Sequence, residues 1–354
     1  MMSLLLKANA TKTCGALSLM LVSYAVNSAE PIIVYGKLDI AIQQSDIQVE
    51  LENSFPKTEV NVDKTTVDGS GTRLGVMGEY ELNYNLATFY RIEYQVDTGD
   101  ISKANLSARN QYVGLKGDFG NVRLGRYDTV LNLSQGKLDQ FNDTPGDIKY
   151  LFRGDNRLAQ TVTFYTPEYN YFKLGVTYVA ESDSEQIKAK ADELSVNKDK
   201  VNKGDSGVSI VALLGDSSLK DVPFFVSVAY DSQIKGYNII RASAQGTMND
   251  FTLGVMYQQQ ELDFGTKEKH EGYLISGAYH IQNVDFKFQY QYINGGQKSA
   301  LTPNGQYTKT SSYSVGADYY LAKSTNLYAF YTAFDYDDLE SNNQHFGVGL
   351  IHKF

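Results

Sequence analysis

The chain has 354 residues, a formal net charge of −9 and a single cysteine. Because there is no basic excess to neutralise phosphates, the composition excludes nucleic acid as an expected partner. Twenty-seven tyrosines, 17 phenylalanines and only six prolines favour β-strands, in which aromatic side chains are enriched and proline is rare.

The first 28 residues are organised like a secretory signal peptide. Lys7 and Lys12 precede the apolar run 14–26, and residues 26–29, Val-Asn-Ser-Ala, offer small side chains for cleavage. The apolar run is too short for a transmembrane helix, which needs roughly 20 residues. Cys14 lies in this segment, so the mature chain, 29–354, would hold no disulfide and no thiolate metal site. We expect an exported chain without a cofactor.

Sixteen strands are predicted along the mature chain from the alternation of apolar and polar residues. Their ranges are 32–43, 72–82, 86–96, 109–118, 120–127, 158–166, 171–180, 207–214, 222–230, 237–246, 251–261, 272–281, 284–293, 312–321, 325–334 and 345–354. No linker interrupts the series, so 29–354 is expected to form one domain.

The connections between the predicted strands alternate in length. Short turns occur at 83–85, 119, 167–170, 282–283 and 322–324, and long connections occur at 44–71, 97–108, 128–157, 181–206, 262–271, 294–311 and 335–344, with 231–236 as a short exception. Short periplasmic turns and long outer loops are typical of outer-membrane barrels. The charged segment 184–204 has no core pattern and is expected to be mobile or to form a short surface helix.

Each predicted strand has an apolar and a polar face. In the strand 284–293, for example, Phe286 and Phe288 alternate with Asp285 and Lys287. One such strand would also fit a soluble sheet. Sixteen of them in a closed barrel would enclose a lumen too wide for side chains to fill. The polar faces are therefore predicted to line water, and the apolar faces to contact lipid.

The last predicted strand ends on the aromatic Phe354, which shares a face with Val348 and Leu350. An amphipathic strand with this ending is typical of a barrel whose last strand closes against its first. The sequence thus predicts an all-β fold, a 16-stranded antiparallel transmembrane β-barrel of the outer membrane.

The segment 113–126, Val-Gly-Leu-Lys-Gly-Asp-Phe-Gly-Asn-Val-Arg-Leu-Gly-Arg, resembles the hairpin of the fourth and fifth strands in general diffusion porins of Gram-negative bacteria. Further matches, at 35–37, 72–75, 326–328 and the terminal Phe354, extend the resemblance over the mature chain. The resemblance implies a homotrimer of 16-stranded barrels. It also implies that the third outer loop folds into the lumen and that its acidic residues face a basic cluster on the wall.

The third long connection, 128–157, is the candidate constriction loop, since loops of this length are usually functional. The acidic residues predicted to line the pore constriction are Asp139, Asp143 and Asp147. The family's Pro-Glu-Phe-Gly element is matched only in part, by Asp-Thr-Pro-Gly at 143–146. Strand parity turns Lys37, Arg73, Arg91 and Arg123 toward the lumen, and the resemblance adds Arg109 and Arg157 to this basic wall.

Opposite charges across a narrow, water-filled neck would orient dipolar solutes and select ions by sign. The alternative for each of these charges is an ordinary solvated residue of the lumen or loop. Asp39, Glu79 and Glu93 also face inward by parity and favour cation passage.

The leading function is passive diffusion of small hydrophilic solutes and ions through the outer membrane. The alternatives are a substrate-selective channel and an adhesin-like barrel that acts through its outer loops. The expected surroundings are outer-membrane lipid and lipopolysaccharide. No enzyme is expected: Gly-Asp-Ser-Gly at 204–207 copies the nucleophile motif of trypsin-like proteases, but all four histidines lie downstream of it.

Overall fold

The computed structural model describes residues 32–51, 58–69, 71–83, 85–99, 105–265, 267–298, 307–337 and 342–354. The predicted signal peptide, 1–28, lies outside the described residues. The strands are β1 (Ile33–Leu51), β2 (Thr58–Asp68), β3 (Arg73–Asn83), β4 (Leu86–Val96), β5 (Leu106–Gly117), β6 (Gly120–Asp128), β7 (Arg157–Tyr165), β8 (Phe172–Val179), β9 (Gly207–Gly215), β10 (Phe224–Ile234), β11 (Tyr237–Met248), β12 (Phe251–Leu262), β13 (Lys269–Ile281), β14 (Val284–Lys298), β15 (Tyr307–Ala322), β16 (Thr325–Tyr336) and β17 (Asn342–Lys353). The helices are α1 (Val130–Leu133) and α2 (Ser184–Glu193), and two short 3₁₀ turns, η1 (Ile148–Tyr150) and η2 (Lys198–Lys200), accompany them.

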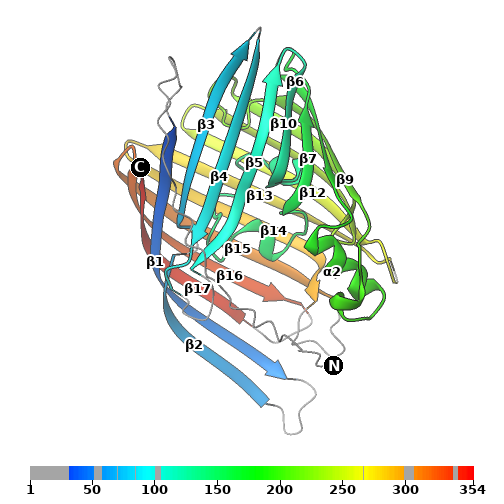
Figure 1. The fold of residues 1–354 in the computed structure, drawn as a ribbon. Helices are drawn as coiled ribbons and strands as arrows, with labels where there is room; N and C mark the ends of the chain where they lie inside the picture. The colour runs from blue at the N-terminus through cyan, green and yellow to red at the C-terminus, as the bar shows by residue number, and fades with distance from the viewer. Residues whose placement is uncertain are drawn as a thin grey trace, which may run out of the picture.

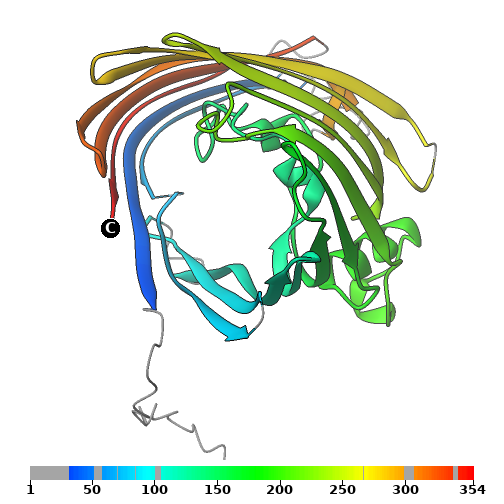
Figure 2. The same cartoon turned by 90° about the horizontal axis from the view of Figure 1, so that it is seen from above.

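The strands form one closed antiparallel ring (Figures 1 and 2). From β3 to β17 each strand pairs with the next one in the chain, and β17 pairs with β1 from Lys37↔Lys353 to Ile47↔Asn343. The predicted 16-stranded antiparallel barrel is confirmed, because β2 and β3 together occupy one of its positions. No helix within the described ranges is long and apolar enough to cross a membrane.

The prediction that residues 44–71 form a loop is wrong in part. Strand β1 continues to Leu51 and pairs with β2 from Ala41↔Asp68 to Leu51↔Thr58, whereas its beginning pairs with β3. At the break between β2 and β3, the Thr72 hydroxyl bonds the backbone N–H and carbonyl of Asp39, both at 3.0 Å. The two blue strands extend beyond the ring in Figure 1. The alternating sequence Ile-Gln-Val-Glu-Leu at 47–51 carries the signal for this extension.

The side-chain pattern of the ring is inverted relative to a soluble protein. On β12, Leu253, Val255 and Tyr257 are 57, 52 and 44% exposed, whereas Met256 and Gln258, on the opposite face of the strand, are 2 and 0% exposed. Other strands repeat this arrangement, which places apolar side chains outside and polar ones inside, as predicted. An outer surface of this kind suits lipid, and an inner one suits water.

The seam between the last and first strands is closed by Phe354. Its carbonyl accepts a hydrogen bond from the Gly36 N–H (2.9 Å), and its N–H donates to the Gly36 carbonyl (3.2 Å). The Phe354 ring lies directly against Gly36, where a Cβ atom would come within 2.4 Å of the ring. The terminal strand therefore closes the ring against the first strand, as predicted.

The charged segment 184–204 contains α2, the helical one of the two predicted alternatives. The Asp183 carboxylate caps the helix by accepting from the backbone N–H groups of Glu185 and Gln186. The Gln186 side chain then donates to the carbonyls of Asp205 and Gln233 and accepts from the N–H of Lys235. These bonds tie α2 to the turn between β10 and β11 at the long-loop rim.

Candidate pore constriction

The chain between β6 and β7, residues 129–156, lies inside the ring and is called the L3 loop here (Figure 2). Its Leu138, Ile148, Leu151 and Phe152 are buried against inward side chains of the barrel. The wall side chains of this cluster are Met256, Leu274, Ile293 and Phe334. Helix α1 at the start of the loop buries Val130 and Leu131 in a second cluster, with residues of β7, β9, β10 and β11. The loop folds inward because this burial removes large apolar groups from water.

Five inward glutamines of β11, β12 and β14 hold the backbone of the L3 loop. Gln289 and Gln291 both donate to the Gly146 carbonyl, at 2.9 and 2.7 Å. The other bonds join Gln245 to the N–H of Lys137 (3.0 Å), Gln260 to the N–H of Arg153 (2.9 Å), Gln258 to the carbonyl of Arg153 (2.8 Å), and Gln289 to the N–H of Gln140 (2.9 Å). We call these five side chains the glutamine row. They fix the loop to one half of the wall.

Arg241 on β11 strengthens the same attachment. Its side chain is fully buried and donates to the carbonyls of Leu131 (3.4 Å) and Arg153 (3.0 Å) and to the side chain of Gln258 (2.7 Å). Sequence reasoning missed both Arg241 and the glutamine row. The available signal was their inward parity, since each stands among outward apolar residues of its strand.

Two of the three predicted constriction acids brace the loop from within. The Asp147 side chain is 1% exposed; it accepts from the N–H groups of Asp143 (3.0 Å) and Lys149 (2.9 Å) and pairs with Lys149 Nζ (2.7 Å). Asp139 accepts from the N–H groups of Phe141 (3.0 Å) and Ile148 (3.2 Å). Burial, together with the nearby Asp147 charge, raises the pKa of Asp139 to about 8.

The third acid, Asp143, joins the tip of the loop to β1. Its Oδ2 atom lies 3.0 Å from Lys37 Nζ, and Asp39 Oδ2 lies 2.9 Å from the same nitrogen. Burial alone would raise the pKa of Asp143, but the positive charges of Lys37 and Arg73 hold it below the ordinary value. Asp143 adopts a positive φ of 66°, which turns the chain at this point. The acid therefore touches the basic wall directly.

Four of the predicted basic residues lie on neighbouring strands, and Arg157 and Arg123 lie apart from them. The four are Lys37 on β1, Arg73 on β3, Arg91 on β4 and Arg109 on β5. Lys37 meets Asp143, and the neighbouring Arg91 guanidinium lies 5.6 Å from the Tyr35 ring. Arg109 pairs with Glu93 at 2.7 Å and donates to Gln95 at 3.2 Å.

Arg157 stands apart, at the base of the L3 loop, where its Nε lies 2.8 Å from Asp128 Oδ1. Arg123 lies among aromatic rings of β4 to β7. Arg73 begins β3 beside Lys37, its pairing partner on β1. The roles of these residues in solute passage stay predictions.

The exposed face of the L3 loop is basic and polar. It carries Lys137, Asn142, Lys149 and Tyr150, whereas the loop's acids are turned inward or paired. Across the lumen are the strands β3 to β6, whereas the tip of the loop meets β1 at Lys37 (Figure 2). The water-filled passage therefore runs between this loop face and that part of the wall.

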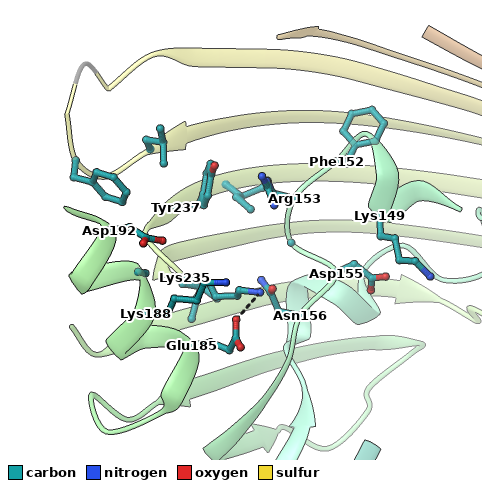
Figure 3. A pocket seen from close by; sticks show the side chains of 16 residues that line it. Lys149, Phe152, Arg153, Asp155, Asn156, Glu185, Lys188, Asp192, Lys235 and Tyr237 are labelled. Carbon is teal, nitrogen blue, oxygen red and sulfur yellow. Dashed lines mark ion pairs between the residues drawn. The ribbon is translucent and has the colours of Figure 1, made fainter. Parts of the chain in front are cut away.

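A cavity lies on each side of the L3 loop. The one toward the long-loop rim has a volume of about 510 Å³ and lies between the loop and α2. Figure 3 shows Arg153, Asp155 and Asn156 of the loop and the α2 side chains that line this cavity with them, where an ion pair joins Glu185 to Lys235. The cavity toward the short-turn rim has a volume of about 340 Å³. Within the described ranges, no group of three or more acidic or histidine side chains is placed to hold a metal ion.

A closed barrel with an apolar outside, a polar inside and a loop folded into its lumen is a transmembrane channel protein. The model of the Gram-negative porin family matches residues 15–339, and the chain belongs to this family.

Curated relatives include a monosaccharide porin of Halomonas sp., 23% identical over 74% of this chain and 72% of its own. The major outer membrane protein P.IB of Neisseria meningitidis serogroup A is 23% identical over 96% of this chain and 98% of its own. The fold is shared by the anion-selective porin of Comamonas acidovorans, with a TM-score of 0.63, 16% identity, and coverage of 92% of this chain and 99% of that one. It is also shared by OmpF of Salmonella typhi, solved with daunomycin, with a TM-score of 0.65, 15% identity and coverage of 91 and 97%.

The chain is thus an outer-membrane porin. Its family and fold indicate a channel rather than an enzyme. The similar structures include a trimer form of Vibrio cholerae OmpT, with a TM-score of 0.61, 16% identity and coverage of 92% of this chain and 99% of that one.

Proposed function

We propose that this porin forms a homotrimer in which each barrel passes small hydrophilic solutes and ions by passive diffusion. The single observation that carries the proposal is the attachment of the L3 loop to one half of the wall, because it leaves a polar passage along the other half. Segment 1–28 serves as a signal peptide that is removed on export. The exposed apolar band contacts outer-membrane lipid, and the long loops contact lipopolysaccharide.

In this proposal, Lys37, Arg73, Arg91 and Arg109 form the charged side of the constriction, and Asp143 is the acid that reaches it. Asp139 and Asp147 act indirectly, because they hold the loop that carries Asp143. Arg123 lies nearer the short-turn rim, and Arg157 secures the base of the loop. The combined field at the neck acts on ions and dipoles that pass it.

The test is the conductance of the refolded mature protein in a planar lipid bilayer with a salt gradient. We expect large current steps in groups of three, with a mild reversal potential and little block by neutral sugars. Silent insertion of a correctly folded barrel would reject the channel and favour an adhesin-like role of the outer loops. Saturable block by one class of neutral sugar would instead favour a substrate-selective channel.

Reversing the charge of Asp143 tests the composition of the neck. The Asp143→Lys variant should shift the reversal potential toward anions, because it replaces the acid by which the L3 loop contacts Lys37 with another cation. The matched control is Asp199→Lys, on the exposed turn η2 of an outer loop, which should leave the reversal potential nearly unchanged. Equal reversal potentials for Asp143→Lys and the parent protein would remove Asp143 from the constriction.

A further inference from the structure

The cavity between the L3 loop and the short-turn rim has the size of a small-molecule site. Its volume of about 340 Å³ falls within the range of roughly 300–1,000 Å³ that is usual for ligand pockets. Side chains from β6, β8 and β10 and from the L3 loop line it, among them Asn121, Arg123, Gln135, Lys173 and Phe225. Its lining combines two cations and several amides with an apolar floor.

Arg123 is held in this lining by four aromatic rings, an arrangement that we call the Arg123 cage. The centre of its guanidinium lies 4.7 Å from the Tyr127 ring, 5.3 Å from those of Phe89 and Tyr165, and 5.7 Å from that of Tyr112. All four distances are within the roughly 6 Å over which a ring face attracts a cation. The cage therefore fixes the guanidinium in place and stabilises its charge.

The Arg123 charge has no acidic partner within the described ranges, unlike those of Lys37, Arg109 and Arg157. Its Nε and Nη1 atoms are buried without a hydrogen-bond acceptor there, so Nη2 is the nitrogen left to bond a solute. Lys173 at the same cavity is paired with the partly exposed Glu168 at 3.0 Å. Among the described residues, the cavity thus presents an oriented cation without an acidic partner.

We propose that this cavity binds small hydroxylated carboxylates, such as sugar acids. The carboxylate bonds Arg123 Nη2 and approaches Lys173, since a guanidinium prefers an anionic oxygen as acceptor. The hydroxyl groups bond the amides of Asn121 and Gln135, and the carbon skeleton lies on Phe225 and Tyr165. The inference deepens the proposed function, on which it rests, by naming a solute class for one part of the passage.

The experiment is calorimetric titration of the refolded barrel in detergent with gluconate, and with glucose as the neutral analogue. We expect saturable binding of gluconate only. The Arg123→Gln variant should lose about tenfold or more in affinity, because it removes a charge-assisted hydrogen bond. Arg123→Lys keeps the charge but not the planar donor, so its affinity should lie between those of Arg123→Gln and the parent.

Two control variants separate a site from a general charge effect. Lys323→Gln removes the same charge from an exposed turn between β15 and β16 and should leave gluconate affinity unchanged. Arg91→Gln removes a lumen charge outside the cavity and should weaken binding much less than Arg123→Gln.

The proposal is overturned if gluconate shows no saturable binding, or if Arg91→Gln weakens it as much as Arg123→Gln does. The titration does not depend on current through the channel. A protein that binds gluconate but stays silent in the bilayer would contradict the diffusion function and support the site, and a conducting protein without gluconate binding would do the reverse.

Discussion

The titration of Asp139 in the L3 loop makes the free energy of unfolding depend on pH. An aspartate titrates near pH 4 in an unfolded chain, whereas burial beside Asp147 raises the Asp139 pKa to about 8 in the folded one. Between these values the folded chain holds a proton that the unfolded chain has released. The contribution of Asp139 to the free energy of unfolding is therefore highest at or below about pH 4, falls as the pH rises toward about 8, and levels off above it.

We predict that Asp139→Asn removes this dependence. The variant should lose less of its thermal midpoint than the parent protein between pH 5 and pH 9, because an amide has no proton to release. The measurement is the heat-induced shift in gel migration at both pH values. Parallel losses in the two proteins would assign the pH effect to other groups.

The two neighbouring acids of the loop illustrate what sequence reasoning can and cannot reach at this scale. The sequence identified Asp143 and Asp147 as candidates of equal standing. Their difference arises from the loop path: the positive φ of Asp143 turns its side chain toward Lys37, whereas Asp147 begins the turn η1 and accepts from Lys149. Neither the path nor the partner can be deduced from residue type, since any loop aspartate is compatible with both roles.

The L3 loop depends, as an element, on the glutamine row. We predict that the double variant Gln289→Leu and Gln291→Leu loosens the loop, because it leaves the buried Gly146 carbonyl without its two donors. A buried polar group left without a partner costs about 1–3 kcal/mol. The measurement is open-channel current noise, which should rise, together with tryptic cleavage after the exposed Lys137 or Lys149.

The matched control for this prediction is Gln344→Leu. Gln344 lies near the outer end of β17, where it accepts from the Tyr331 hydroxyl at 3.1 Å, a contact that does not involve the loop. The Gln344→Leu variant should change neither the open-channel current noise nor the tryptic cleavage of the loop. Unaltered noise in the double variant would show that the apolar clusters alone hold the loop.

At the scale of the whole molecule, the barrel depends on the seam between β17 and β1. Deleting Phe354 removes two backbone hydrogen bonds to Gly36 and should lower the thermal midpoint of the barrel. Phe354→Leu keeps the backbone pairing and should lower the midpoint less. The measurement is gel migration after heating. Equal losses in the two variants would show that the aromatic ring, rather than the pairing, stabilises the seam.

The ring could be predicted from the sequence because a strand of a wide barrel needs only a local pattern. On β12 and β14, for example, the alternation of outward apolar and inward polar residues specifies both the strand and its orientation. The contacts of the lumen are different in kind. Arg241 and Leu131 are 110 positions apart, and their hydrogen bond depends on how the closed ring places β11 beside the loop. No local pattern encodes such a pair.

The one-sided attachment of the L3 loop has a consequence for sieving. A plug at the centre of a cylinder leaves a round ring of water, whereas a loop fixed to one half of the wall leaves a crescent. The narrow dimension of a crescent, rather than its area, decides which solute enters. Flat molecules such as planar rings should therefore permeate faster than globular molecules of the same mass, and permeation rates should rank with the smallest thickness of the solute.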